Sequence, residues 1–281
     1  MKILKNVIIY GALIGLLSLS MYYFYNSTKD AQATKKSEEQ KKEEVSKTQV
    51  IAHRGYWDTE GSAQNTLAAL KAAQDIDVYG SEFDVQMTSD DELIVVHGHG
   101  YQTIEDVRKV PYSEIKPLLV EKNQEVVPLL SDYLDLGAKD KGVKLILEIK
   151  DNLTPERETA MVEKILAMVE QKGLEDQVEY IAFSLHVCKE LVRLKPGVTV
   201  AYLMGNITPA EAKEYGFTGI DYNYGKINEN PEWIQQAHDL GLTVNVWTVN
   251  AEEDIRKAIE QGVDFITTDA PELAQRLVAE K

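Results

Sequence analysis

The sequence predicts an α/β fold of the (β/α)8 type, a TIM barrel, over residues 49–281. Two observations carry this prediction. Eight short runs rich in β-branched and aromatic residues alternate with amphipathic helical stretches, which is the pattern of parallel strands joined by helices. Eight such units also fit the length of the segment, since barrels of this type commonly take about 250 residues. An open doubly wound sheet is the alternative, but no glycine-rich phosphate loop follows the first strand.

Each expected strand is short and is followed by a turn or by a helical stretch. The eight runs are 49–54, 79–87, 144–150, 178–184, 199–204, 219–224, 243–249 and 264–269. Helical periodicity is clearest in 65–75, 155–173 and 252–262. Several helical stretches end in glycine, a common helix stop: Gly173, Gly216, Gly241 and Gly262.

One segment interrupts the alternation of strands and helices. Residues 92–98, ELIVVHG, follow the second strand too closely for a helical crossover. We therefore expect an extra β-hairpin after that strand, with its turn near Ser89-Asp90-Asp91. Residues 99–130 then form an irregular excursion near the rim of the barrel.

The N-terminal segment 1–28 is strongly apolar. Residues 7–25 contain no charge, and a helix of that length would span about 28 Å, close to the core of a bilayer. Lys2 and Lys5 precede it, which favours a cytoplasmic N-terminus and an extracellular domain. A cleaved signal peptide is the alternative, since Ala31-Gln32-Ala33 has a small-x-small cleavage pattern. The protein is thus expected at the cell membrane with a single pass, or secreted.

A charged linker, residues 29–48, separates this segment from the barrel. Most of the side chains in 34–48 are Lys or Glu, and almost none is apolar. Such a stretch cannot bury enough surface to fold alone, so we expect a flexible, solvated tether.

Composition and charge exclude several classes of protein. Hydrophobic residues make up 44% and charged residues 27%, which is ordinary globular usage and not that of a disordered chain, a collagen or a coiled coil. The single cysteine, Cys188, excludes an intramolecular disulfide and a cysteine-based zinc cluster. Residues 49–281 hold 41 acidic and 22 basic side chains, net −19, which argues against nucleic acid as a partner. An anionic substrate would need local positive charge.

Carboxylates cluster where a barrel carries its active site, at the C-terminal ends of the strands. Glu82 and Asp84 are two positions apart in one strand and therefore share a face, and Glu148 and Lys150 do the same in another. Three inward carboxylates are costly unless they are paired or bind a metal. Oxygen ligands of this kind suit one divalent cation, Mg²⁺ or Ca²⁺. A solvated strand face and a cross-strand ion pair are the alternatives.

Two histidines and two positively charged side chains complete the set of polar residues expected at the site. His53 and Arg54 end the first strand, and His97 ends the hairpin. Histidine titrates near neutrality and suits acid and base roles, whereas Arg54 and Lys150 are suitable partners for a phosphate. Together with a divalent cation, these residues are the groups needed to cleave a phosphodiester.

The chain resembles the glycerophosphodiester phosphodiesterases, a family of TIM barrels, over roughly residues 49–275. The segments that carry the resemblance are HRG (53–55), QNT (64–66), SEFDV (81–85), TSDDELIVVHG (88–98), LEIK (147–150), VWTVN (246–250) and TTDAP (267–271). Gln64 stands where the family usually has Glu, and Gly98 where an Asp usually follows the second histidine. The missing Asp removes a hydrogen bond expected to orient His97.

The resemblance implies an activity and assigns roles. The substrate's own glycerol 2-hydroxyl would attack phosphorus, and water would open the cyclic phosphate, giving an alcohol and glycerol 3-phosphate. The roles are cation ligands at Glu82, Asp84 and Glu148, acid and base at His53 and His97, phosphate contacts at Arg54 and Lys150, and substrate contacts at Asn65 and Trp247. The expected partners are a small-molecule or lipid-derived glycerophosphodiester and, through the N-terminal helix, the membrane. No obligate protein partner is inferred.

Two other functions remain open at this point. A lysophospholipase D, sphingomyelinase D-like or phosphoinositide-cleaving enzyme would need an apolar lip, which the apolar residues of 99–130 could provide. A non-catalytic barrel that binds the cell envelope is the second alternative, and the intact set of histidines and carboxylates argues against it.

Overall fold

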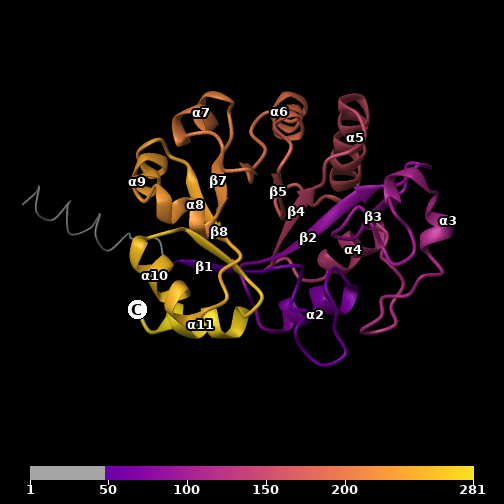
Figure 1. The fold of residues 1–281 in the computed structure, drawn as a ribbon, viewed down its shortest axis with the longest axis horizontal. Helices are drawn as coiled ribbons and strands as arrows, with labels where there is room; N and C mark the ends of the chain where they lie inside the picture. The colour runs from indigo at the N-terminus through magenta and orange to yellow at the C-terminus, as the bar shows by residue number, and fades with distance from the viewer. Residues whose placement is uncertain (1–47) are drawn as a thin grey trace, which may run out of the picture. The chain divides into compact units, whose positions relative to one another are not determined.

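Eight parallel strands close into a barrel in the computed structural model, which describes residues 48–281 (Figure 1). The barrel strands are β1 (Gln49–Ala52), β2 (Gly80–Met87), β4 (Lys144–Ile149), β5 (Val178–Ala182), β6 (Val200–Tyr202), β7 (Gly219–Asn223), β8 (Thr243–Trp247) and β9 (Phe265–Thr268). The barrel closes because β1 pairs with both β9 and β2. Each strand lies within one of the eight expected runs, and the predicted TIM barrel is confirmed.

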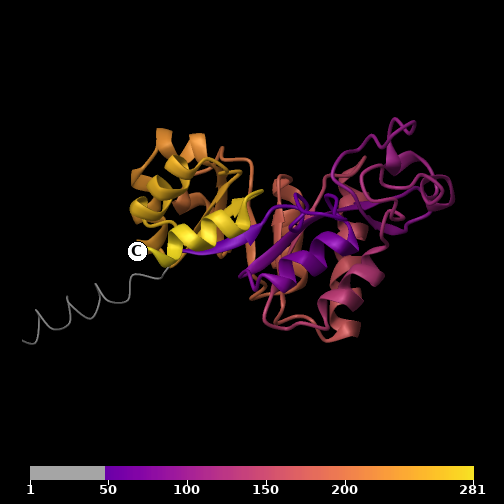
Figure 2. The ribbon, with the colours of Figure 1, turned by 90° about the horizontal axis from the view of Figure 1, so that it is seen from below.

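Helices surround these strands on the outside of the barrel (Figure 1). They are α2 (Leu67–Asp75), α4 (Leu130–Gly137), α5 (Pro155–Lys172), α6 (Leu185–Leu194), α7 (Pro209–Glu214), α8 (Tyr224–Glu229), α9 (Glu232–Asp239), α10 (Glu252–Gln261) and α11 (Pro271–Ala279). The last helix, α11, lies against the first strand, β1, and so covers the seam where the barrel closes (Figure 2).

Local sequence explains where these helices begin and end. Thr154 caps α5, because its side chain accepts a hydrogen bond from the backbone N–H of Arg157, and Pro155 follows at the first helical position. Gly173 ends the same helix with a left-handed backbone, φ 64°, which glycine adopts without a steric penalty. The helical stretch 155–173 is thus confirmed at both ends.

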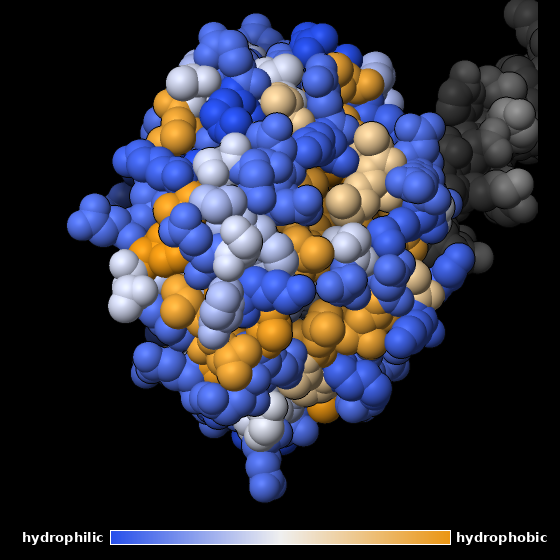
Figure 3. All heavy atoms as spheres, turned by 90° about the vertical axis from the view of Figure 1, so that its right-hand side faces the viewer, coloured by the Kyte–Doolittle hydropathy of each residue, from blue (hydrophilic) through white to orange (hydrophobic). Residues whose placement is uncertain are grey.

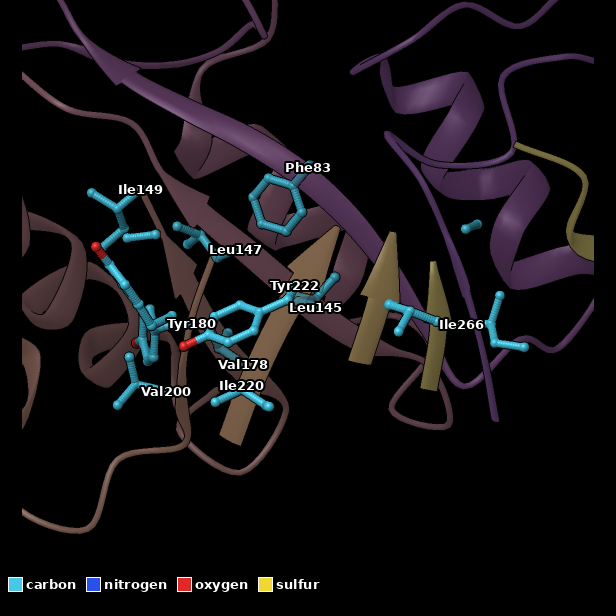
Figure 4. Close-up of a cluster of buried hydrophobic side chains, with 14 of the residues drawn as sticks. Phe83, Leu145, Leu147, Ile149, Val178, Tyr180, Val200, Ile220, Tyr222 and Ile266 are labelled. Atoms are coloured by element: carbon cyan, nitrogen blue, oxygen red, sulfur yellow. The ribbon is translucent and has the colours of Figure 1, made fainter. Parts of the chain in front are cut away.

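Alternation along the strands divides the apolar residues into two layers. Side chains such as Phe83 and Leu147 point away from the barrel axis and pack under the helices (Figure 4). A smaller cluster inside the barrel contains Ile146 and Ile181. Because successive side chains of a strand point to opposite faces, the neighbours of Phe83, which are Glu82 and Asp84, point inward.

The predicted hairpin is present. Strand β3 (Leu93–Val95) runs antiparallel to β2, with Val85 opposite Val95. The excursion that follows contains a 3₁₀ turn, η1 (Val107–Lys109), and a short helix, α3 (Tyr112–Ile115).

The excursion has a small hydrophobic core of its own. Its apolar residues pack on one another and on the hairpin: the buried members of this cluster are Val107, Ile115 and Val127 from the excursion and Ile94 and Val96 from the hairpin. Leu119 and Val126 are exceptions, with 38% and 40% of their surface exposed. On the side of the molecule that carries α3, apolar residues form separate groups between polar ones (Figure 3). The broad apolar lip that a lipid enzyme would need here is therefore not formed by these residues.

Within residues 48–281, no helix has both the length and the apolar character needed to cross a membrane. The expected anchor or signal segment, 1–28, lies outside the described residues, as does nearly all of the expected linker, 29–48.

Candidate active site

One cavity opens among the carboxyl ends of the barrel strands, where barrels carry their active sites. Its volume is about 110 Å³. The residues that line it are His53, Arg54, Glu82, His97, Glu148, Lys150, Ile181, Phe183, Leu203, Asp221, Trp247, Thr248 and Thr267. Seven of the nine residues expected at the site are therefore in its wall, and the other two, Asp84 and Asn65, lie behind it.

Glu82, Asp84 and Glu148 form a buried carboxylate cluster. Asp84 on β2 stands opposite Glu148 on β4 in the strand register. One oxygen from each of the three groups lies within 4.8 Å of the others. Glu82 Oε1 finds no hydrogen-bond donor in the part of the chain that the structure describes. A buried oxygen of this kind is costly to leave unpaired, so the three groups fit a hard divalent cation, which prefers carboxylate oxygens.

Burial and mutual repulsion shift the pKa values of the three carboxyl groups. Burial, together with the charges of Asp84 and Glu148, raises the pKa of Glu82 well above its usual range. Burial and Asp84 raise the pKa of Glu148 to about 8. Burial also raises the pKa of Asp84, but Lys150 outweighs it and leaves that pKa below its usual value. A divalent cation would favour the ionised form of all three carboxylates.

Lys150 is the main cation beside this cluster. Its Nζ lies 2.7 Å from Asp84 Oδ1 and 2.5 Å from Glu148 Oε1. Burial alone would lower the pKa of Lys150, but the two carboxylates raise it above its ordinary value. Lys150 therefore stays charged and lies at the cavity wall, where it can attract a phosphate.

Arg54 is held in an unusual backbone conformation. Its φ is 57°, and its backbone N–H donates to Glu82 Oε2 at 2.7 Å. Its Nη1 donates to Gln64 Oε1 at 2.7 Å, while its Nε has no acceptor among the described residues. Gln64, the departure from the family pattern, thus supports the guanidinium as a neutral acceptor. This Nε lies 3.7 Å from Asp84 Oδ2, so Arg54 also forms an ion pair with the carboxylate cluster.

Gly55 allows this turn to pack closely. Its φ is +76°, and a Cβ at this position would lie 2.6 Å from the Cβ of Ala69 on α2. The backbone N–H of Gly55 donates to the carbonyl of Glu82 at 2.9 Å. The glycine of the HRG motif therefore lets the loop after β1 approach both α2 and β2.

Asn65 holds Asp84 in place and does not line the cavity. Its Nδ2 donates to Asp84 Oδ2 at 2.8 Å, and its Oδ1 accepts from the Asp84 backbone N–H at 3.0 Å. The residue is 4% exposed. The expected direct contact of Asn65 with substrate is thus replaced by a positioning contact, because both ends of the amide are taken by Asp84.

His53 is oriented by a carboxylate from the other end of the chain. Its Nδ1 lies 2.8 Å from Asp269 Oδ1. Trp57 Nε1 and Asn250 Nδ2 also donate to Asp269, at 2.9 and 2.8 Å. Burial raises the pKa of Asp269, but the hydrogen bonds from His53 and Trp57 outweigh it and lower it to about 2. An ionised Asp269 keeps the proton of neutral His53 on Nδ1 and leaves Nε2 as an acceptor.

His97 lacks such a support. No side chain among residues 48–281 makes a hydrogen bond to its ring, and the only bond to this residue is from Gln86 to its backbone carbonyl. Burial lowers the pKa of His97 to about 4, with Asp84 opposing the shift and Lys150 adding to it. A Cβ at Gly98 would lie 3.0 Å from the carbonyl oxygen of Gly100. An Asp at this position would therefore require the backbone at Gly100 to shift by a few tenths of an ångström.

Comparison with known proteins supports one assignment. The sequence model of the glycerophosphoryl diester phosphodiesterase family matches residues 53–273. The chain belongs to this family. A glycerophosphodiester phosphodiesterase of Caldanaerobacter subterraneus subsp. tengcongensis is 29% identical over 251 residues, which cover 83% of this chain and 98% of the relative.

Solved structures of glycerophosphodiester phosphodiesterases share the fold of this chain. A glycerophosphodiester phosphodiesterase from Parabacteroides distasonis matches with a TM-score of 0.82 and 43% identity, over 84% of this chain and 98% of its own. A putative glycerophosphoryl diester phosphodiesterase from Silicibacter pomeroyi DSS-3 matches with a TM-score of 0.72 and 28% identity, over 84% of this chain and 94% of its own.

Sequence reasoning gave no role to two acidic residues of this phosphodiesterase-family site. Asp269 was visible at the end of the last strand, but its partner could not be identified without the barrel register. Asp221 interrupts the otherwise uncharged run GIDYNY, and that lone charge in a buried strand was the available signal. Phe183 and Leu203 were missed because apolar residues at strand ends look the same whether they line a cavity or a core.

Proposed function

We propose that this chain hydrolyses glycerophosphodiesters to an alcohol and glycerol 3-phosphate, with the help of one divalent cation. The observation that carries the proposal is the shared cavity. It brings together two histidines and the positively charged side chains of Arg54 and Lys150 from strands far apart in the sequence. Two of the three buried carboxylates, Glu82 and Glu148, lie in the same wall. Family membership and relatives named for this reaction support it.

The carboxylates of Glu82, Asp84 and Glu148 would hold the cation. Oxygen ligands favour Mg²⁺ or Ca²⁺ over softer metals. When bound, the cation would stabilise negative charge that develops on the phosphoryl oxygens. Arg54 and Lys150 add fixed positive charge at the same wall, and this local charge offsets the acidity of the rest of the domain.

His53 is the better placed first base. Because Asp269 binds Nδ1–H, the lone pair of Nε2 can accept the proton of the attacking hydroxyl, and the ionised Asp269 stabilises the imidazolium that forms. The oxygen of the glycerol 2-hydroxyl then bonds to phosphorus, and the bond from phosphorus to the leaving alcohol breaks.

His97 would supply the proton that the leaving alcohol needs. The pKa of His97 is lowered when no substrate is bound in the cavity. An anionic phosphodiester beside the ring favours the protonated form and raises that pKa. In the second step the roles reverse: His97 takes a proton from water as the water oxygen bonds to phosphorus, the bond from phosphorus to the 2-oxygen of glycerol breaks, and His53 returns its proton to that oxygen.

The products of glycerophosphocholine test this proposal. Choline and glycerol 3-phosphate are expected, because the bond from phosphorus to the alcohol breaks. Glycerol and phosphocholine would mean cleavage on the other side of phosphorus and would contradict the proposed orientation. Replacement of His53 by Ala should abolish either product while the thermal melting curve is retained.

We further infer an extracellular location from the apolar segment 7–25. It would tether the barrel to the outer face of the cell membrane, within reach of glycerophosphodiesters of the envelope. Mass spectrometry of the mature protein tests this: an intact N-terminus in the membrane fraction is expected. A chain that begins just after Ala33 would show the secreted form, and an intact chain shielded from external protease would contradict both.

A further inference from the structure

Asp221 is a buried carboxylate in the cavity that the reaction described above does not use. It lies on β7, lines the cavity and is 1% exposed. Its Oδ1 has no hydrogen-bond donor within residues 48–281. Burial raises the pKa of Asp221 to about 7.

A second unpaired acceptor stands beside it. Asn245 on β8 is the cross-strand neighbour of Asp221 in the register. Its Nδ2 donates to Thr267 Oγ1 at 2.9 Å, which leaves its own Oδ1 without a donor among the described residues. Asn245 also makes a side-chain hydrogen bond to Asp221, so it holds this carboxylate, and it is not among the residues that line the cavity. Asp221 Oδ1 is therefore the unpaired acceptor that a hydrogen-bond donor in the cavity, such as a hydroxyl, can satisfy.

The cation cluster lies on a different part of the barrel. Glu82 and Glu148 come from the adjacent strands β2 and β4, whereas Asp221 comes from β7. A substrate whose phosphate lies at the cluster must therefore extend across the barrel interior to reach Asp221.

Asp221 is a fixed, buried group, 1% exposed. Leaving alcohols differ from one substrate to the next, whereas every substrate carries the same glycerol, so glycerol is the part that a fixed buried carboxylate can recognise. The 2-hydroxyl is engaged at phosphorus, so the terminal hydroxyl is the donor left over.

Trp247 links this part of the cavity to an apolar wall. Its Nε1 donates to the backbone carbonyl of Asp221 at 3.0 Å, and its ring packs edge-on against Phe183 at 5.5 Å. The carbon chain of glycerol can lie on this wall while its terminal oxygen meets the carboxylate.

We propose that Asp221, held by the hydrogen bond from Asn245, recognises the terminal hydroxyl of the substrate's glycerol and restricts the enzyme to esters in which that hydroxyl is free. This inference rests on the proposed phosphodiesterase function. A lysophospholipid with its acyl chain on this oxygen lacks the donor proton and brings a bulky chain into an enclosed space. A site built to bind a hydroxyl rejects an analogue without it by large factors, because its own polar groups are left unpaired.

Two substrates that differ by one hydroxyl test the proposal. Glycerophosphocholine carries the terminal hydroxyl, and 2-hydroxypropyl phosphocholine lacks it but keeps the attacking hydroxyl. The full-length enzyme should prefer the first by about 100-fold or more in kcat/KM. In Asp221→Ala the preference should fall at least about tenfold, mainly through KM. The preference of the isosteric variant Asp221→Asn should lie between those of the unmodified enzyme and Asp221→Ala. This variant replaces Asp221→Ala in the test if the alanine variant has a lowered melting temperature.

The possible outcomes distinguish a failure of this inference from a failure of the proposed function. An unchanged preference in both Asp221 variants would overturn the inference while leaving the phosphodiesterase function in place. Equal turnover of 1-acyl lysophosphatidylcholine and glycerophosphocholine by the unmodified enzyme would overturn it as well. No turnover of any of these esters, with either cation present, would contradict the proposed function itself.

Discussion

His53 Nδ1 and Asp269 Oδ1 lie 2.8 Å apart although the two residues are separated by 216 positions in the chain. Strands β1 and β9 pair at the seam of the barrel, with Ala52 opposite Thr268. His53 and Asp269 each follow directly on one of these strand ends. Closure of the barrel therefore builds the pair, and correct folding is a condition for the proposed base.

Asp269 should be needed for the chemical step and not for cation binding. In Asp269→Asn, the amide can donate to Nδ1, which would place the proton of neutral His53 on Nε2 and remove the acceptor. We expect kcat to fall by about 100-fold or more. The affinity for the cation, measured by calorimetry, should be unchanged. A variant that keeps a third of the original kcat would contradict the proposed role.

The leaving alcohol should distinguish the two histidines. If His97 protonates this alcohol, His97→Ala should reduce turnover of glycerophosphocholine by about 100- to 10,000-fold. The loss should be much smaller for the first-step release of nitrophenolate from a nitrophenyl ester of glycerol phosphate, measured in a single turnover, because this leaving group needs no proton. His53→Ala should be impaired on both esters. Equal losses for the two variants on both esters would show that the roles are assigned wrongly.

Cation binding should strengthen as the pH rises. In the metal-free protein the pKa of Glu148 is raised to about 8 from an ordinary value of 4.5. Its protonated form therefore stabilises the fold below pH 4.5, and this contribution is lost as the pH rises through about 8. The cation needs the ionised form, so binding releases protons.

We accordingly expect the dissociation constant of Mg²⁺ or Ca²⁺ to fall between pH 6 and pH 8. The change should reach about tenfold per pH unit for each carboxylate that must lose a proton. Calorimetry in two buffers of different ionisation enthalpy would count those protons. Glu148→Gln is the matched control and should weaken binding and reduce the pH dependence. A constant affinity over this range would contradict the assignment of Glu148 as a ligand.

Gly55 and Gly61 provide a matched pair for the packing of the first loop. Both have positive φ, +76° and +73°, but a Cβ at Gly55 would lie 2.6 Å from Ala69 Cβ, whereas one at Gly61 meets nothing within 4 Å. Gly55→Ala should therefore lower the free energy of unfolding by about 2–4 kcal/mol, and Gly61→Ala by about 1 kcal/mol. Denaturant titration measures both, and equal losses would show that the contact with α2 is unimportant.

The period-two pattern of the strands was enough to predict the carboxylate cluster. Glu82 and Asp84 alternate with Phe83, which packs under the helices, so the sequence already placed both carboxylates inside the barrel. Glu148 was placed by the same reasoning in β4. The hairpin was predictable as well, because the segment between β2 and β3 is too short for a helix.

Contacts that depend on register or on loop conformation were not predictable. Asn65 carries no pattern that distinguishes a substrate contact from a hydrogen bond to Asp84, and its position depends on a left-handed backbone, φ 60°. The apolar residues of 99–130 suggested a lipid-binding lip, but most of them form a separate small core. Only the folded arrangement shows which apolar side chains cover one another.

The most direct test of the account is turnover of glycerophosphocholine by the purified full-length chain before and after removal of divalent cations. We predict that glycerol 3-phosphate is released, that a chelator stops its release, and that Mg²⁺ or Ca²⁺ restores it. The variant Glu82→Gln should remain inactive after the cation is added back. Undiminished turnover in the chelated enzyme, or full activity of Glu82→Gln, would contradict the claim that the three buried carboxylates hold an essential cation.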